Sequence, residues 1–212
     1  MSRSSGPIEV ERKFVPGPGV EDHLRSMGAE LQDEMVFQDS YYDTPDLRLT
    51  LADLWLRRRG DTWELKHPPV RGARGLTGAS TQYQELNCES EIRRRVSEEL
   101  GVPCPPSLEN LDLEEFARFV TTRRRFLLSP QDGSDFKAVV VDLDTTDFGF
   151  AVGEVEVLVQ TQEEVQNAMK KVEDICRQLG VLSESPVPGK MTTFLQRNRV
   201  EHYRQLLEAH VL

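Results

Sequence analysis

Charged residues spaced two apart run along several stretches that otherwise have the pattern of β-strands, and they are the residues best suited to chemistry. In the stretch 8–14, Glu9, Glu11 and Lys13 alternate with mostly apolar residues. Alternate side chains of a strand point to opposite faces, so these three charges share one face. A single charged face is usually only solvated. Other stretches of this sequence repeat the pattern, however, and that favours a shared site.

The matching charges occur between residues 54 and 160. The basic members are Arg57, Arg59, Lys66, Arg123 and Arg125, and the acidic members are Glu64, Glu85, Asp142, Asp144, Glu154 and Glu156. Carboxylates are the ligands that hard divalent cations such as Mg²⁺ and Mn²⁺ prefer. Arginine and lysine bind phosphate oxygens. Together the two sets predict a site for a polyphosphate–metal complex.

Two architectures fit this pattern. The charged faces either point outward from an ordinary core, or line the bore of an antiparallel sheet that closes into a barrel. Helices predicted over 20–27, 90–100, 161–179 and 189–209 need an apolar sheet face to cover, which favours the barrel. Consecutive strands interrupted by helices predict an α+β fold with about eight strands.

The expected elements follow from hydrophobic periodicity and turn residues. Strands are predicted over 8–14, 30–42, 54–59, 62–67, 81–88, 120–128, 137–143 and 150–160, with 54–67 forming a hairpin. The stretches 46–52 and 111–118 resemble helical turns. Thr161 and Glu164 form a capping box at a helix start. The stretch 68–80, which contains Arg71 and Arg74, predicts a loop that could close over a barrel mouth.

Composition narrows the class of protein. The chain has 212 residues, a net charge of −10 and a pI near 5.0, which argues against a general nucleic-acid surface. Its three cysteines are too few and too scattered for a disulfide framework, and we expect them to be inert packing residues. No stretch has the roughly 18 apolar residues of a membrane span, and residues 1–7 lack the apolar run of a signal peptide. We expect a cytoplasmic monomer with one domain over 1–212, a barrel over about 8–160 and helices over about 161–210.

Several short motifs together resemble the CYTH superfamily, the triphosphate tunnel metalloenzymes. The first is the Glu-x-Glu-x-Lys pattern at residues 9–13. The others are the stretches 41–45 (YYDTP), 55–59 (WLRRR), 63–66 (WELK), 141–144 (VDLD) and 152–156 (VGEVE). They occur in the order of the family and extend over about residues 8–198.

This resemblance implies an eight-stranded antiparallel closed β-barrel with helices packed around it. It also implies a small-molecule substrate, thiamine triphosphate, hydrolysed to the diphosphate and phosphate with Mg²⁺, or Mn²⁺ as an alternative. By motif position, the metal would be held by Glu9, Glu11, Asp142, Glu154 and Glu156. The phosphates would be held by Lys13, Arg57, Arg59, Lys66, Arg123, Arg125 and Lys190.

The mechanistic hypothesis is in-line attack of water on the terminal phosphoryl group. Crowding by arginines would depress the pKa of Lys66 and let it assist proton transfer, paired with Tyr41. Trp55 either stacks on the cationic thiazolium or only packs. Alternation places Arg123 and Arg125 in the bore and Arg124 outside, and it allows only one of Tyr41 and Tyr42 to face inward.

Several alternatives remain open at this point. Glu64 and Glu85 either bind metal or pair with bore arginines, and pairing is the favoured interpretation. The protein could instead be an inorganic tripolyphosphatase or an adenylyl cyclase of the same superfamily. It could also be a non-catalytic polyphosphate- or nucleotide-binding module, although such a module would not need the full carboxylate set, or a barrel whose bore holds only structural ion pairs and no ligand.

Overall fold

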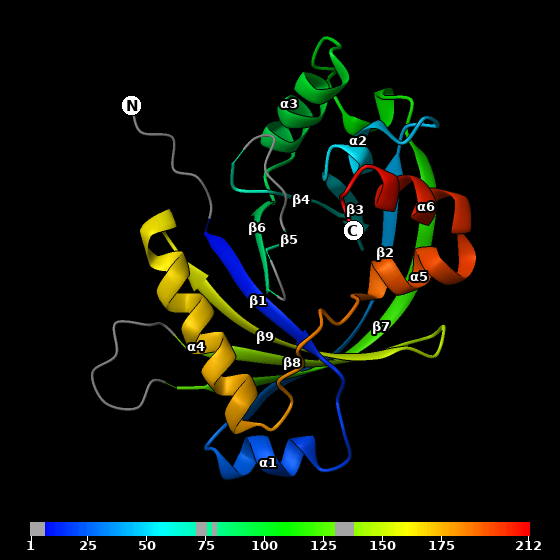
Figure 1. The fold of residues 1–212 in the computed structure, drawn as a ribbon. Helices are drawn as coiled ribbons and strands as arrows, with labels where there is room; N and C mark the ends of the chain where they lie inside the picture. Colours follow the sequence, from blue (N-terminus) through cyan, green and yellow to red (C-terminus); the bar gives the residue numbers. More distant parts are fainter. Residues whose placement is uncertain (1–6, 71–75, 78–79, 130–137) are drawn as a thin grey trace.

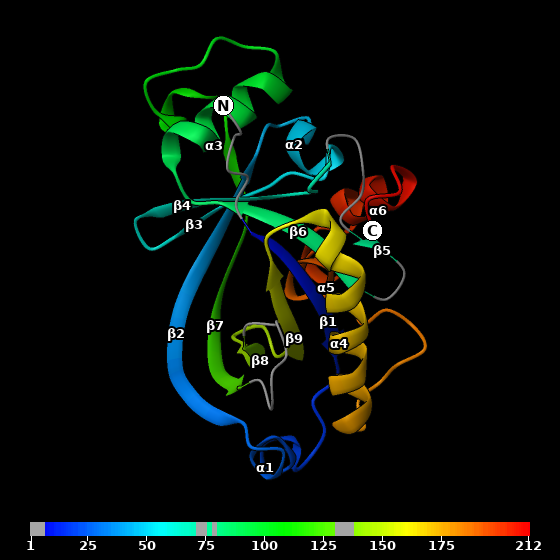
Figure 2. The ribbon, with the colours of Figure 1, turned by 90° about the vertical axis from the view of Figure 1, so that its left-hand side faces the viewer.

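A closed antiparallel barrel dominates the computed structural model, which describes residues 7–70, 76–77, 80–129 and 138–212. The strands follow the order β1-β9-β8-β7-β2-β3-β4-β6-β5, and β1 also pairs with β6, so that eight of them form a closed ring (Figures 1 and 2). The predicted eight-stranded barrel is confirmed. Its strands are β1 (Ile8–Phe14), β2 (Glu30–Asp43), β3 (Trp55–Arg59), β4 (Thr62–His67), β6 (Ser80–Leu86), β7 (Glu114–Leu128), β8 (Val139–Thr146) and β9 (Ala151–Val159).

A ninth strand, β5 (Leu76–Thr77), pairs with β6 at the edge of this ring. It lies in the stretch 68–80, which the sequence predicted to be entirely loop. Arg71 and Arg74 of that stretch, and the proposed movement of the loop over the barrel mouth, lie outside the described residues.

The apolar faces of the strands point outward and are covered by helices. On β1, Val10 and Phe14 are fully buried, whereas Glu9, Glu11 and Lys13 face the bore. The helix α4 (Val165–Gln178) lies across the outside of β1 and β9, and its Val172 belongs to the same cluster as Val10 (Figure 1). Burial of these large apolar surfaces drives the barrel wall to fold with its charges inside.

Other helices cover the remaining outer faces. The helix α3 (Glu89–Leu100) packs on β4 and β6, with Ile92 and Val96 against Leu56 and Leu65. The helix α1 (Val20–Ser26) inserts Leu24 into the cluster beneath α4. A short helix, α2 (Arg48–Leu51), follows β2. The predicted helices over 20–27 and 90–100 are therefore present and do cover the sheet.

The last two helices behave differently from the expectation that they cover an outer face. They are α5 (Lys190–Asn198) and α6 (Val200–Glu208), which pack against each other (Figure 1). Phe194 of α5 contacts Phe119, with 5.5 Å between ring centroids, and Phe119 lies on the inner face of β7 in line with Arg123. The helix α5 therefore closes one end of the barrel from within.

The helical turn predicted over 111–118 is wrong. A 3-10 turn occupies Leu108–Asn110, and β7 already begins at Glu114. The stretch pairs with the end of β2, from Glu114 opposite Asp43 to Arg118 opposite Ser40, with a register shift at Tyr41. Long-range pairing with β2 overrides the local pattern, because each strand residue gains ladder hydrogen bonds. The capping box of Thr161 and Glu164 and the hairpin of β3 and β4 are as predicted.

The cysteine prediction is only partly correct. Cys176 is a buried residue of α4, but Cys88 and Cys104 are exposed, and all three are free thiols. Among the described residues, no helix has both the length and the apolar character to cross a membrane.

Gly153 allows a close contact in the barrel wall. A Cβ atom at this position would lie 2.1 Å from the ring of Phe14, which is fully buried. We predict that Gly153→Ala lowers the free energy of unfolding by about 1–3 kcal/mol, because the overpacked ring must move. Urea unfolding measures the change. Gly17→Ala is the matched control, since nothing lies within 4 Å of its Cβ position, and equal stability of the two variants would contradict this account.

Candidate active site

The bore of the barrel contains a cavity of about 550 Å³. Its wall includes nearly every residue that the sequence predicted to act in the site. These are Glu9, Glu11, Lys13, Tyr41, Trp55, Arg57, Arg59, Lys66, Arg123, Arg125, Glu154, Glu156 and Lys190. Asp142 is the exception: it is 2% exposed and lies behind the wall, where it contacts two of these arginines. Tertiary structure thus gathers residues that span most of the sequence.

Buried carboxylates hold the arginines of the bore in place. Arg59 donates two hydrogen bonds to Asp39, at 2.7 and 2.9 Å, and Asp39 is fully buried. Burial alone would raise the pKa of Asp39, but the bond from Arg59 outweighs it, so the pKa is lowered. Arg57 lies 2.5 Å from Glu64 and 3.3 Å from Glu85. These contacts agree with the interpretation of the two glutamates as partners of arginine.

The neighbouring strands β7 and β8 repeat this arrangement. Arg123 donates to both oxygens of Asp144 at 2.7 Å, and Arg125 donates to both oxygens of Asp142 at 2.8 Å. Arg124 points outside and bonds to Glu34 at 2.7 Å. The predicted alternation of the three arginines is confirmed. Paired, planar guanidinium groups with fixed orientation are suited to binding phosphate.

Four glutamates form an acidic wall on β1 and β9. Glu9 accepts a hydrogen bond from Lys66 at 2.5 Å, and Glu11 accepts one from Lys13. Glu154 lies 3.3 Å from Arg123. These cations lower the pKa values of Glu11 and Glu154 despite the opposing effect of burial.

Glu156 differs from the other three glutamates. Within the described residues, its carboxyl group makes no hydrogen bond or ion pair, although Glu11 lies directly opposite it in the ladder. Burial and the negative charge of Glu9 and Glu11 raise the pKa of Glu156 to about 8. At neutral pH the carboxyl group of Glu156 is therefore mostly protonated, and it is uncharged although no cation pairs with it.

The structure overturns one expectation about Lys66. Burial tends to remove its charge, but attraction by Glu9 and Glu11 outweighs both burial and the repulsion from Arg57, so the pKa of Lys66 is raised. The predicted depression is wrong because the acidic wall is closer than expected. Burial raises the pKa of Tyr41, which lines the cavity, whereas Tyr42 packs outside on Trp63. Only one of the two tyrosines faces inward, as predicted.

Part of the cavity wall is apolar or aromatic rather than charged. This part includes Trp55, Tyr83 and Met191, which follows Lys190 at the start of α5. The helix α6 and the C-terminal tail supply the rest of this part, namely Tyr203, Leu207, Val211 and Leu212. A ligand in this cavity would therefore meet both charged groups and apolar or aromatic side chains.

Comparison with known proteins agrees with this geometry. The family model described as CYTH domain matches residues 7–189. The chain belongs to the CYTH family. It is 43% identical over 98% of its length to proteins named thiamine-triphosphatase from Macaca fascicularis and Homo sapiens, and the match covers 92% of each relative.

Solved structures share the CYTH fold at lower identity. The PH1819 protein of Pyrococcus horikoshii OT3 is 20% identical, with a TM-score of 0.58 over 90% of this chain and 99% of that one. The Hippeastrum protein HpAC1, described as an adenylyl cyclase with a dominant triphosphatase activity, is 18% identical, with a TM-score of 0.60 over 90% and 96% of the two chains.

Some residues of this CYTH site were missed by reasoning from sequence. Asp39 precedes Tyr41 by two residues and so shares its face, a signal that was available in the alternation of β2. Asp144 was grouped with the acidic residues but given no role, and it is buried and bonded to Arg123 and Lys190. The contributions of Tyr203 and Leu207 had no signal in the sequence, because the path of α6 depends on tertiary packing.

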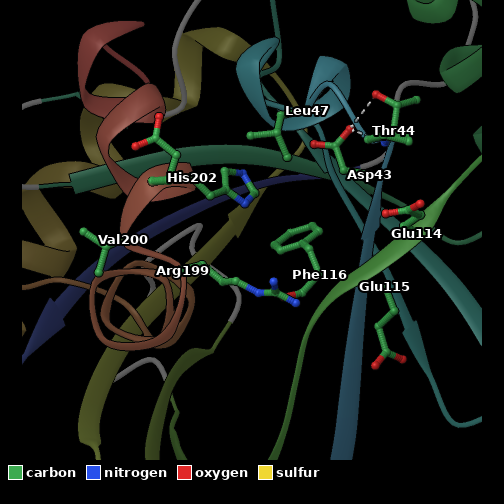
Figure 3. Close-up of a pocket in the computed structure, with 11 residues that line it drawn as sticks. Asp43, Thr44, Leu47, Glu114, Glu115, Phe116, Arg199, Val200 and His202 are labelled. Carbon is green, nitrogen blue, oxygen red and sulfur yellow. Dashed lines mark hydrogen bonds between the residues drawn. The ribbon is translucent and has the colours of Figure 1, made fainter.

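A second, smaller cavity of about 340 Å³ lies outside the barrel, between α2, the start of β7 and α6 (Figure 3). Beside it, Asp43 accepts hydrogen bonds from the Thr50 hydroxyl at 2.6 Å and from three backbone N–H groups. The Thr50 oxygen in turn lies 2.8 Å from Nε2 of His202, which packs edge-on against Phe116. Since the Thr50 proton goes to Asp43, His202 donates, and this chain of bonds fastens α6 to α2.

His202 makes the stability of this CYTH protein depend on pH. Burial lowers its pKa despite the attraction of Asp43, so the unfolded state binds more protons. We predict that the free energy of unfolding falls as the pH drops below about 6.5, with a slope of at most about 1.4 kcal/mol per pH unit from this residue. His202→Gln should remove that part of the slope, because glutamine can donate to Thr50 without titrating.

Urea unfolding between pH 5.5 and 7.5 measures this effect as the difference between the two proteins. Groups elsewhere, including the tunnel glutamates and His67, titrate equally in both and cancel. His23→Gln is the control, because His23 is exposed. Parallel curves for wild type and His202→Gln would rule out a contribution of His202.

Proposed function

We propose that this protein hydrolyses thiamine triphosphate to thiamine diphosphate and phosphate. The observation that carries the proposal is that one cavity combines a charged lining with an apolar, aromatic part. Such a cavity matches a substrate with a triphosphate at one end and an organic cation at the other. The names of the relatives that are 43% identical over nearly the whole chain support the same substrate.

The basic residues of the bore bind the triphosphate in this proposal. Guanidinium groups fixed by buried carboxylates need little reordering when phosphate arrives, so their binding energy is not spent on side-chain entropy. The lysines add compact charge near the reacting phosphoryl group. The residues assigned to this role are Lys13, Arg57, Arg59, Lys66, Arg123, Arg125 and Lys190.

The acidic wall is the proposed site of a divalent metal, Mg²⁺ or alternatively Mn²⁺. Buried carboxylate oxygens fit a hard dication, and Glu156 offers a carboxyl group that makes no ion pair within the described residues and would release its proton when a metal binds. No three acidic, histidine or cysteine side chains of the described residues already converge on one point, so binding requires Lys13 and Lys66 to release their glutamates. A bound dication would neutralise charge that develops on the transferred phosphoryl group. The proposed ligands are Glu9, Glu11, Asp142, Glu154 and Glu156, with Asp142 also anchoring Arg125.

Lys66 and Tyr41 are the proposed catalytic residues. Both pKa values are raised, so both groups hold their protons at neutral pH. Their role is therefore to donate hydrogen bonds or a proton to the departing diphosphate oxygen, rather than to act as a base. The arginine clamps hold the terminal phosphoryl group for in-line attack by water. Trp55, in the apolar, aromatic part of the cavity wall, would stack on the thiazolium ring.

We also propose that residues 1–212 form one domain, with the barrel over about 8–160 and helices over about 161–210, and that the protein is a cytoplasmic monomer. Three free thiols, two of them exposed, favour a reducing compartment. Light scattering coupled to size-exclusion chromatography tests the oligomeric state.

The proposed activity predicts strict dependence on metal and on Glu156. Phosphate release from thiamine triphosphate should exceed release from tripolyphosphate and ATP, and a chelator should abolish it. Glu156→Gln should lower kcat/KM by about 100-fold, equivalent to about 3 kcal/mol of lost transition-state stabilisation. The control is Glu163→Gln, which changes an exposed glutamate outside the barrel.

The other outcomes separate the alternatives. Preference for tripolyphosphate would support triphosphate hydrolysis in the bore but would reject thiamine as the organic part of the substrate. Binding of all three compounds without hydrolysis would identify a polyphosphate-binding module. Full activity in the presence of chelator would reject the metal.

A further inference from the structure

Asp53 is a buried carboxylate that holds two aromatic residues of the cavity wall. It accepts a hydrogen bond from the indole Nε1 of Trp55 at 2.8 Å and one from the hydroxyl of Tyr83 at 2.9 Å, both at the same oxygen, Oδ1. It is fully buried, whereas Trp55 and Tyr83 line the cavity. Asp53 therefore lies behind the two aromatic residues and is not itself part of the cavity wall.

The two aromatic residues belong to strands that do not pair with each other. Trp55 begins β3 and Tyr83 lies in β6, and β4 separates them in the barrel. No ladder hydrogen bond fixes the distance between their side chains. Because one oxygen atom accepts from both, the indole N–H and the phenol hydroxyl are held close to the same point.

The backbone of Asp53 indicates that its side chain has a purpose here. Its φ is 60°, and it follows directly after the end of α2, where glycine is the usual residue. A non-glycine residue in this left-handed region is strained, although aspartate tolerates it better than most. The strain is retained together with two hydrogen bonds that glycine could not make.

The negative charge of Asp53 also affects the chemistry of the two rings. Burial and this charge raise the pKa of Tyr83 well above its ordinary value, so the phenol stays protonated and donates. A ring that donates to a carboxylate becomes richer in electrons, because hydrogen bonds polarise their donors. Electron-rich faces bind cations more strongly.

We propose that Asp53 is a positioning residue that selects triphosphates with a cationic organic group, by fixing Trp55 and Tyr83 and enriching their ring faces. The inference rests on the proposed function, in which the organic group is the thiazolium of thiamine. It assigns the discrimination against inorganic tripolyphosphate to a residue that never touches the substrate.

The test compares kcat/KM for thiamine triphosphate and tripolyphosphate in wild type, Asp53→Gly and Asp53→Asn. Glycine relieves the backbone strain, so loss of folding is not expected. Asp53→Gly should lower the ratio of the two kcat/KM values at least about tenfold, mainly by raising KM for thiamine triphosphate. Asp53→Asn keeps an acceptor oxygen without the charge and should fall between wild type and Asp53→Gly. Asp61→Asn, an exposed aspartate in the next turn, should leave the ratio unchanged.

A second readout needs no substrate. The chain has two tryptophans, so Trp63→Phe leaves Trp55 as the only one. In that background, Asp53→Gly should increase quenching of Trp55 fluorescence by acrylamide, because the indole is no longer held, and Asp53→Asn should increase it less.

The possible failures can be told apart. An equal loss for both substrates, or an unchanged ratio with unchanged quenching, would overturn the role of Asp53 while leaving the proposed function intact. A wild-type protein without preference for thiamine triphosphate would refute the proposed function, and this inference with it.

Discussion

The structure depends on the burial of opposite charges inside a small barrel. An ion removed from water loses several kcal/mol of hydration, and only close, well-oriented partners compensate for that loss. Asp39, Asp142 and Asp144 supply such partners for three arginines, each through paired hydrogen bonds. The apolar strand faces must then point outward, and helices are needed to cover them. Barrel closure, helix placement and the charged bore are therefore consequences of one constraint.

The compensation is uneven, and that unevenness is where chemistry becomes possible. On the arginine side of the bore, each buried carboxylate is bonded to a guanidinium group, so the side chains are fixed before any ligand arrives. On the glutamate side, Glu9 and Glu11 hold lysines that a ligand can displace, and Glu156 has no such partner among the described residues. A rigid cationic clamp thus faces an acidic wall that can rearrange. This is the combination that a phosphate–metal complex requires.

The cavity wall is also uneven in polarity, because part of it is apolar. The helix α5 closes one end with Phe194 against Phe119, while α6 and the tail bring Tyr203 and Leu212 into the same cluster as Trp55. The bonds from His202 through Thr50 to Asp43 hold α6 in that position from outside the barrel. Asp53, which is buried behind the cavity wall, holds the side chains of Trp55 and Tyr83. The shape of the apolar part of the cavity therefore depends on residues that lie outside the cavity.

The sequence by itself determined the barrel and most of its charged lining. Alternation along a strand is a local property, so charges at positions such as Glu9 and Glu11, or Arg123 and Arg125, could be assigned to one face without knowledge of the fold. Only the tertiary structure decided which opposite charges meet. Lys66 illustrates this: its neighbours in the barrel are Glu9 and Glu11 rather than arginines alone, and the direction of its pKa shift reversed. The strand at Glu114–Arg118, the closure of the bore by α5 and the bonds of Asp53 were likewise invisible. Each depends on contacts between residues far apart in the chain, which no local pattern encodes.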